Sequence, residues 1–133
     1  MKLVLASNSA GKLAEGQALF APLGGELVAQ GELDGTEAPE PHCTFVENAL
    51  AKARNAALDT GLPAIADDAG LCVEAFGGRP GVDTAYYATL FGYAKSDDNN
   101  VVALLEQMAG IDDRRAALVS TLVAVRSATD PEP

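Results

Sequence analysis

The start of the chain constrains the fold most, because an apolar run leads directly into a small polar turn and then into a helix pattern. Residues 2–6 are mostly Val, Leu and Ala, as expected of a buried strand, and residues 7–12 are small or polar. Apolar residues of the following helix are expected on one side. They are Leu13, Leu19, Phe20 and Leu23. A strand, a polar loop and a helix in this order predict an α/β protein.

The rest of the chain repeats strand and helix patterns. Further strands are expected at residues 26–29, 62–66, 71–76 and 116–126, and helices at residues 45–59 and from residue 97 onward. Residues 31–43 are acidic and rich in proline, which favours a functional loop. We therefore expect a single domain over residues 1–133, with a mixed twisted sheet flanked by helices and an active-site cleft at the strand ends.

Charge and composition exclude several function classes. Nine basic and nineteen acidic residues give a net charge of −10, which repels nucleic acid. No apolar run reaches the roughly 18–20 residues that span a bilayer, so we expect no membrane partner and a cytoplasmic location. Cys43 and Cys72 lack CxxC spacing, which argues against a disulfide or a zinc site.

The polar turn after the first strand is a candidate phosphate-binding loop. Small side chains let backbone N–H groups approach an anion at a helix N-terminus, and a lysine adds a positive charge. The residues concerned are Ser7, Asn8, Ser9, Ala10, Gly11 and Lys12. An ordinary helix cap explains the same residues equally well.

A pair of carboxylates follows a buried strand pattern at Asp67 and Asp68. Carboxylates at the C-terminal end of a strand in an α/β sheet lie where ligands bind, and they suit Mg²⁺. A solvated turn before Gly70 is the alternative.

Two charged residues belong to the helix that begins near Phe45. Glu47 is three residues after Thr44, so it is either a capping-box glutamate or a ligand. Lys52 is either a phosphate-binding group or a surface lysine whose stem lies along the helix. His42 is expected to be exposed rather than catalytic.

Four blocks of the sequence resemble the inosine triphosphate pyrophosphatase family. They are residues 7–15 (SNSAGKLAE), 44–53 (TFVENA with Lys52 and Ala53), 65–71 (IADDAGL) and 78–82 (GRPGV). Members of this family hydrolyse ITP, dITP and XTP to the monophosphate and pyrophosphate with Mg²⁺. The resemblance therefore implies an enzyme, a nucleoside triphosphate pyrophosphatase, and a homodimer.

The resemblance also implies roles for individual residues. It places the triphosphate against residues 7–12, Lys52 and Ala69, and makes Asp68 the catalytic carboxylate that holds the metal and the attacking water. Its metal-site neighbours would be Asp67, Glu47 and Glu40.

The chain departs from the family pattern at several positions. Pro39 replaces the first of two glutamates, Ser9 replaces asparagine, Ala69 replaces a common serine, and Tyr86 replaces arginine. The Phe-Gly-Tyr-Asp and Ser-His-Arg segments with which the family binds the purine are absent, so the chain resembles a family member without its C-terminal third. We expect weak discrimination between ITP and ATP, and self-association through the strand at residues 116–126.

Two other functions stay open from the sequence. One is a folded but inactive nucleotide-binding or interaction fragment. The other is a Maf-like nucleotide pyrophosphatase, suggested by residues 5–9, although that pattern continues with paired arginines where Gly11 and Lys12 stand.

Overall fold

The computed structural model describes residues 1–33 and 42–133. In chain order the elements are β1 (Lys2–Leu5), α1 (Ala10–Phe20), η1 (Ala21–Leu23), β2 (Glu26–Ala29), η2 (Gln30–Leu33), α2 (Phe45–Thr60), β3 (Ala64–Val73), η3 (Glu74–Phe76), η4 (Gly81–Phe91), α3 (Asp97–Gln107) and β4 (Ala116–Val125).

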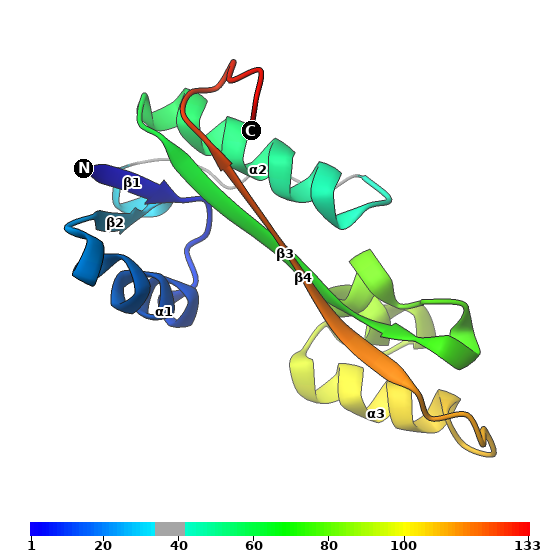
Figure 1. Ribbon diagram of the computed structural model, residues 1–133. Helices are drawn as coiled ribbons and strands as arrows, with labels where there is room; N and C mark the ends of the chain where they lie inside the picture. The colour runs from blue at the N-terminus through cyan, green and yellow to red at the C-terminus, as the bar shows by residue number, and fades with distance from the viewer. Residues whose placement is uncertain (34–41) are drawn as a thin grey trace. The chain divides into compact units, whose positions relative to one another are not determined.

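The described strands form one sheet in the order β2-β1-β3-β4. Strand β1 pairs in parallel with both β2 and β3. Figure 1 shows that β4 runs beside β3 in the opposite direction. The sheet is therefore mixed, and with its helices it confirms the expected α/β fold.

The chain forms two compact units, and β3 and β4 contribute residues to both. Unit 1 comprises residues 1–68 and 121–133, and unit 2 comprises residues 69–120. The polar loop, α2 and both adjacent aspartates all belong to unit 1.

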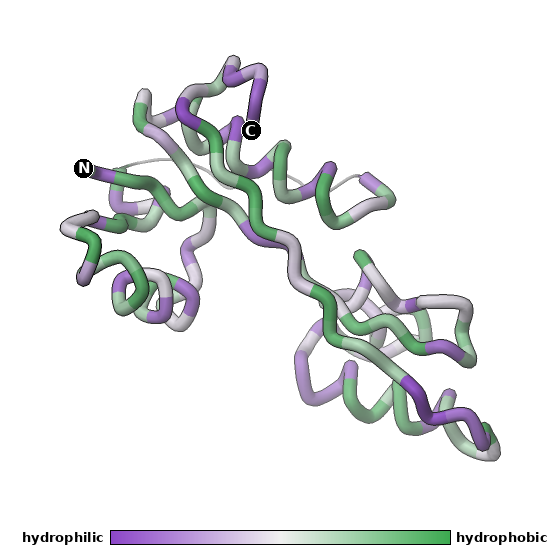
Figure 2. Tube along the Cα trace, viewed as in Figure 1, coloured by the Kyte–Doolittle hydropathy of each residue, from purple (hydrophilic) through white to green (hydrophobic). Residues whose placement is uncertain are grey.

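Small side chains build the core of unit 1. Its buried members are Val4, Ala6, Ala53, Ala56, Ala57, Ala64, Ala66 and Val125. Three of these alanines lie on α2 and two on β3, so little side-chain volume separates the helix from the strand. Figure 2 shows hydrophobic residues along β1 and the first part of β3. This packing brings the polar atoms of α2 within reach of the β3 backbone.

The predicted apolar face of α1 is correct only in part. Leu13 and Phe20 are half-buried, whereas Leu19 and, in η1, Leu23 are 72% and 79% exposed, and no residue of α1 is fully buried. The helix approaches β2 at Gly16, where an added Cβ would collide with the buried side chain of Leu27. Gly16 lies on the same helix face as the half-buried Leu13 and Phe20, so the close approach at this glycine and these two side chains together define the face of α1 that meets the sheet.

The predicted break between two strands at residues 67–70 is also wrong. Residues Ala64–Val73 form one continuous strand, in which Ala66, Asp68 and Gly70 are buried in alternation. Pairing with β4, which is distant in sequence, supports β3 where the local pattern suggested a turn. The last paired residues of β1 and β3 are Leu5 and Ile65, so the aspartates lie just beyond the end of β1.

Unit 2 contains a helical segment, η4, to which the sequence analysis assigned no element. Its buried residues Tyr87 and Ala88 pack with Ala103 of α3. The side chain of Asn100 on α3 accepts a hydrogen bond from the Ala88 N–H (2.9 Å) and donates one to the Ala85 carbonyl (3.1 Å).

A buried carboxylate holds the residues after β4 in place. Asp130, with a side chain 2% exposed, accepts hydrogen bonds from the Arg126 guanidinium at 2.7 and 2.9 Å and from the Arg126 backbone N–H. The Arg54 side chain of α2 donates to the Asp130 carbonyl (3.3 Å). The hydrogen bonds from Arg126 hold the pKa of Asp130 well below its ordinary value.

Asp130→Asn should lower the melting temperature by several degrees at pH 7, because it removes the charge that these donors surround. Because the folded-state pKa is depressed, this stabilisation is fully present above the unfolded pKa of about 4 and is lost progressively as the pH falls from there through the folded-state pKa. The difference between the thermal melts of the two proteins should therefore shrink steadily from about pH 4 to about pH 2. Asp113→Asn is the control, since Asp113 binds Arg115 in the same way but is 39% exposed. An equal loss in both variants would contradict the prediction.

Candidate functional site

The polar loop after β1 forms a helix cap. The Ser7 hydroxyl, which is buried, accepts a hydrogen bond from the Ser9 N–H (3.1 Å). Ser9 is the N-cap of α1: its hydroxyl accepts from the Lys12 N–H (3.4 Å) and its carbonyl from the Leu13 N–H (3.0 Å). The cap interpretation is confirmed, and it leaves the phosphate interpretation open, because a capped helix N-terminus still attracts anions.

A glycine close to the loop anchors it to the residues after β2. The Gly31 N–H donates a hydrogen bond to Asn8 Oδ1 (2.8 Å), and a Cβ at Gly31 would lie 2.5 Å from the same oxygen. Position 31 therefore has no room for a side chain while this hydrogen bond is present.

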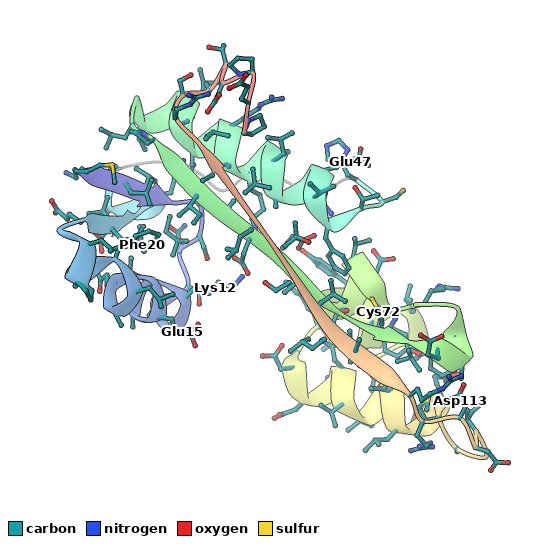
Figure 3. All side chains as sticks on the ribbon, in the orientation of Figure 1. Lys12, Glu15, Phe20, Glu47, Cys72 and Asp113 are labelled. Carbon is teal, nitrogen blue, oxygen red and sulfur yellow. The ribbon has the colours of Figure 1, made fainter. Side chains whose placement is uncertain are left out.

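The first turn of α1 is positively charged. It contains Lys12 and no acidic residue, whereas the first turns of α2 and α3 contain Glu47 and Asp97. A lysine is unfavourable at the positive end of a helix dipole unless an anion lies nearby. Lys12 Nζ lies 3.1 Å from Asp67 Oδ1, and the side chain is 44% exposed (Figure 3).

Lys52 is buried rather than lying on the surface, so the alternative of a surface lysine is wrong. It is 7% exposed, and its Nζ donates to the Asp67 carbonyl at 2.9 Å. The two lysines thus meet β3 at the same residue, one at its side chain and one at its backbone.

Asp68 is the most buried of the predicted acidic site residues that the structure describes. It is 5% exposed, and its Oδ2 accepts a hydrogen bond from Asn48 Nδ2 (3.3 Å) of α2. Successive side chains of a strand point to opposite faces, which explains why Asp67 contacts Lys12 while Asp68 contacts α2. The two aspartates have different partners, although they are adjacent in the sequence.

The sequence analysis missed Asn48. A signal was present, since Asn48 and Lys52 are four residues apart on a helix and hence on one face. That face also carries buried alanines, and two polar residues interrupting it indicate polar partners on the sheet.

Glu47 acts in the helix cap. The Thr44 hydroxyl accepts from the Glu47 N–H (3.3 Å) and donates to Glu47 Oε1 (2.7 Å). His42 Nδ1 lies 3.6 Å from Oε2 of Glu47, which is labelled in Figure 3. Both side chains are exposed, as expected for His42. The capping alternative is confirmed, while a metal-binding role of Glu47 stays a prediction.

The remaining predicted site residues either belong to unit 2 or lie outside the described residues. Glu40 and Pro39 lie outside the described residues. Ala69 is exposed and belongs to unit 2, whereas the site residues described above belong to unit 1. Tyr86 is also in unit 2, with Lys95 Nζ 4.3 Å from the centre of its ring.

The donor set in unit 1 fits Mg²⁺ in one respect. In residues 1–33 and 42–133, no three His, Cys, Asp or Glu side chains gather as a metal cluster. Mg²⁺ usually needs only one or two carboxylates, because waters and substrate phosphates fill its other positions. The buried carboxylate of Asp68 meets that requirement, whereas the carboxylate of Asp67 already forms an ion pair with Lys12.

Strand β1 is followed by the capped N-terminus of α1, and it pairs in parallel with β3, which carries a buried carboxylate. This arrangement is typical of α/β proteins that bind anionic ligands at the ends of the strands. The model of the Ham1 family matches residues 3–133. The chain belongs to the Ham1 family. This membership confirms the resemblance to the inosine triphosphate pyrophosphatase family and argues against a Maf-like protein.

Relatives match over the whole chain. A protein named dITP/XTP pyrophosphatase from Delftia acidovorans is 77% identical over 133 residues, which are 100% of this chain and 66% of that protein. The protein of the same name from Albidiferax ferrireducens is 74% identical and is covered to 67%. The chain therefore spans about two thirds of the length of the curated relatives it matches.

Solved structures agree with the fold. The structure of a HAM1 protein from Coxiella burnetii has a TM-score of 0.90 at 38% identity, with 100% of this chain and 67% of that chain covered. A dITP/XTP pyrophosphatase structure from Mycobacterium abscessus has a TM-score of 0.78 at 40% identity, with 95% and 66% covered. None of the helices in the part of the chain that the structure describes could span a membrane.

Gly31→Ala should destabilise the loop of residues 7–12, because the added methyl group displaces Asn8 Oδ1 and breaks its hydrogen bond with the residue 31 N–H. We expect a loss of about 1 kcal/mol or more in unfolding free energy, measured by urea denaturation. Gly11→Ala is the control, since its Cβ would meet only the Ser9 hydroxyl at 3.9 Å. Equal stability of the two variants would refute the role of Gly31.

Proposed function

We propose that this chain carries the phosphate- and metal-binding part of a nucleoside triphosphate pyrophosphatase. Its substrates would be non-canonical purine nucleoside triphosphates such as dITP, XTP and ITP, which it would cleave to the monophosphate and pyrophosphate. One observation carries the proposal: the acid-free N-terminus of α1, with Lys12, lies against the strand that holds Asp67 and Asp68. The names of the relatives support the substrate class.

Charge supports binding of the triphosphate at this place. The net charge of the chain is −10, so a polyanion must meet concentrated positive charge to bind. Lys12 and the first turn of α1 supply it, and Lys12 can exchange Asp67 for a phosphate oxygen. Lys52 is already bound to the Asp67 carbonyl, so it contributes charge from a fixed position.

Asp68 is the proposed catalytic carboxylate. It would hold Mg²⁺, with Asp67, Glu47 and Glu40 as further candidate ligands, and the bound cation would offset the charge of the phosphate oxygens. The Asp68 carboxylate also accepts a hydrogen bond from the attacking water and orients it toward the α-phosphorus. The water oxygen forms a bond to that phosphorus while the bond from phosphorus to the bridging oxygen breaks. Pyrophosphate leaves, and the proton that the water loses is released to solvent.

The homodimer implied by the resemblance and the cytoplasmic location expected from the sequence belong to the same proposal. Light scattering of the purified chain measures the first, and cell fractionation the second.

Asp68→Asn should reduce pyrophosphate release from dITP at least about 100-fold, since it removes the charge and keeps the shape. The melting temperature should change little, because Asn48 can still donate to the new amide oxygen. Asp112→Asn, an exposed loop position, is the matched control. Turnover of Asp68→Asn at the control rate would refute the assignment. A wild-type chain that binds the nucleotide without releasing pyrophosphate would establish the inactive-fragment alternative.

Lys12→Met should raise KM for dITP, ITP and ATP by a similar factor of roughly ten, because phosphates are common to all three. Lys52→Met should in addition lower stability, since it removes a donor buried against the Asp67 carbonyl. Lys2→Met controls for the general loss of positive charge, because Lys2 is exposed at the start of β1. A KM effect confined to one base would show that Lys12 contacts the purine instead.

A further inference from the structure

A fully buried amide joins the proposed catalytic carboxylate to the chain segment that precedes α2. Asn48 is 0% exposed and lies in the first turns of α2. Its Oδ1 accepts from the His42 N–H at 2.9 Å, and its Nδ2 donates to the His42 carbonyl at 3.2 Å and to Asp68 Oδ2 at 3.3 Å.

These bonds fix which way the amide points. A backbone N–H can only donate and a carbonyl can only accept, so the two bonds to His42 determine which end of the Asn48 amide is oxygen and which is nitrogen. With that orientation, only the NH₂ group can face Asp68. A flipped amide would place its oxygen against the carboxylate and would lose both bonds to His42.

We propose that Asn48 is a positioning residue, which sets the orientation of the Asp68 carboxylate according to the backbone position of His42. The inference rests on the proposed function only for its kinetic consequence. Asn48 does not need to touch the nucleotide: it acts through Asp68. A shift of the His42 backbone would then change the orientation of the Asp68 carboxylate through the side chain of Asn48.

A second asparagine provides a matched comparison. Asn100 of α3 makes the same pair of backbone bonds, to the Ala88 N–H and the Ala85 carbonyl, but it belongs to unit 2. Replacing either asparagine by alanine removes two backbone hydrogen bonds. Only the replacement at position 48 also removes a bond to the proposed catalytic carboxylate.

The test compares Asn48→Ala and Asn100→Ala in the complete 133-residue chain. We expect a larger loss of melting temperature from Asn48→Ala, because Asn48 is fully buried whereas Asn100 is partly exposed. Only Asn48→Ala should speed hydrogen exchange of the His42 amide, by about tenfold or more. It should also lower kcat for dITP at least about tenfold and change KM by less than about threefold. Asn100→Ala should leave the kinetics and His42 exchange unchanged. Unchanged His42 exchange and unchanged kcat in Asn48→Ala would overturn the proposal.

A measurement without turnover covers the case in which Asn48→Ala does not fold. In Asp68→Ala, the side-chain NH₂ resonances of Asn48 should shift in a ¹⁵N correlation spectrum, while those of Asn100 stay in place. Unshifted Asn48 resonances would overturn the proposed link. If the wild-type chain releases no pyrophosphate, the proposed function fails, yet His42 exchange and this spectrum still decide whether Asn48 holds Asp68.

Discussion

The contact between the alanine face of α2 and the sheet is the interaction on which the candidate site depends. Ala53 and Ala56 of α2 are fully buried against a core that includes Ala64 and Ala66 of β3. Methyl groups on both sides leave little space between helix and strand. Short polar side chains, such as the Asn48 amide, can therefore reach β3 from the same helix face, and Lys52 reaches the strand backbone. Larger core residues would separate α2 from the aspartates.

Burial gives these polar contacts their energetic importance. Asn48, Lys52 and Asp68 are all less than a tenth exposed, so each loses solvation that its partners in the protein must replace. Removing one partner leaves a buried polar group without compensation. The site is thus rigid on its α2 side, whereas Lys12, nearly half exposed, is held through an ion pair with Asp67 at the edge of the site. Asp68 is therefore suited to be a fixed carboxylate, and Lys12 is suited to exchange Asp67 for the phosphate oxygens of a bound polyanion.

Most elements of the fold follow from local patterns, and the errors have specific causes. The pattern of β2 and the capped starts of α2 and α3 were predicted from neighbouring residues, because caps and short apolar runs act locally. The continuity of β3 was not, since β4 supports it from a distance of many residues. The exposure of Leu19 on α1 was not predicted either, because the side of α1 that meets the sheet depends on Gly16 approaching Leu27 of another element.

The sequence by itself determined the α/β class, the polar loop at a helix start and the carboxylates available for chemistry, because these depend on residue type and near-neighbour spacing. It did not determine which partners those residues take. Asp67 and Asp68 are identical and adjacent, yet strand alternation turns one to Lys12 and the other to Asn48. Glu47 matches a cap and a ligand equally well until Thr44 is seen to bind it. For the two aspartates only tertiary packing made this choice, because it brings α1, α2 and β3 together from separate parts of the chain, whereas the contact of Glu47 with Thr44 is local to the start of α2.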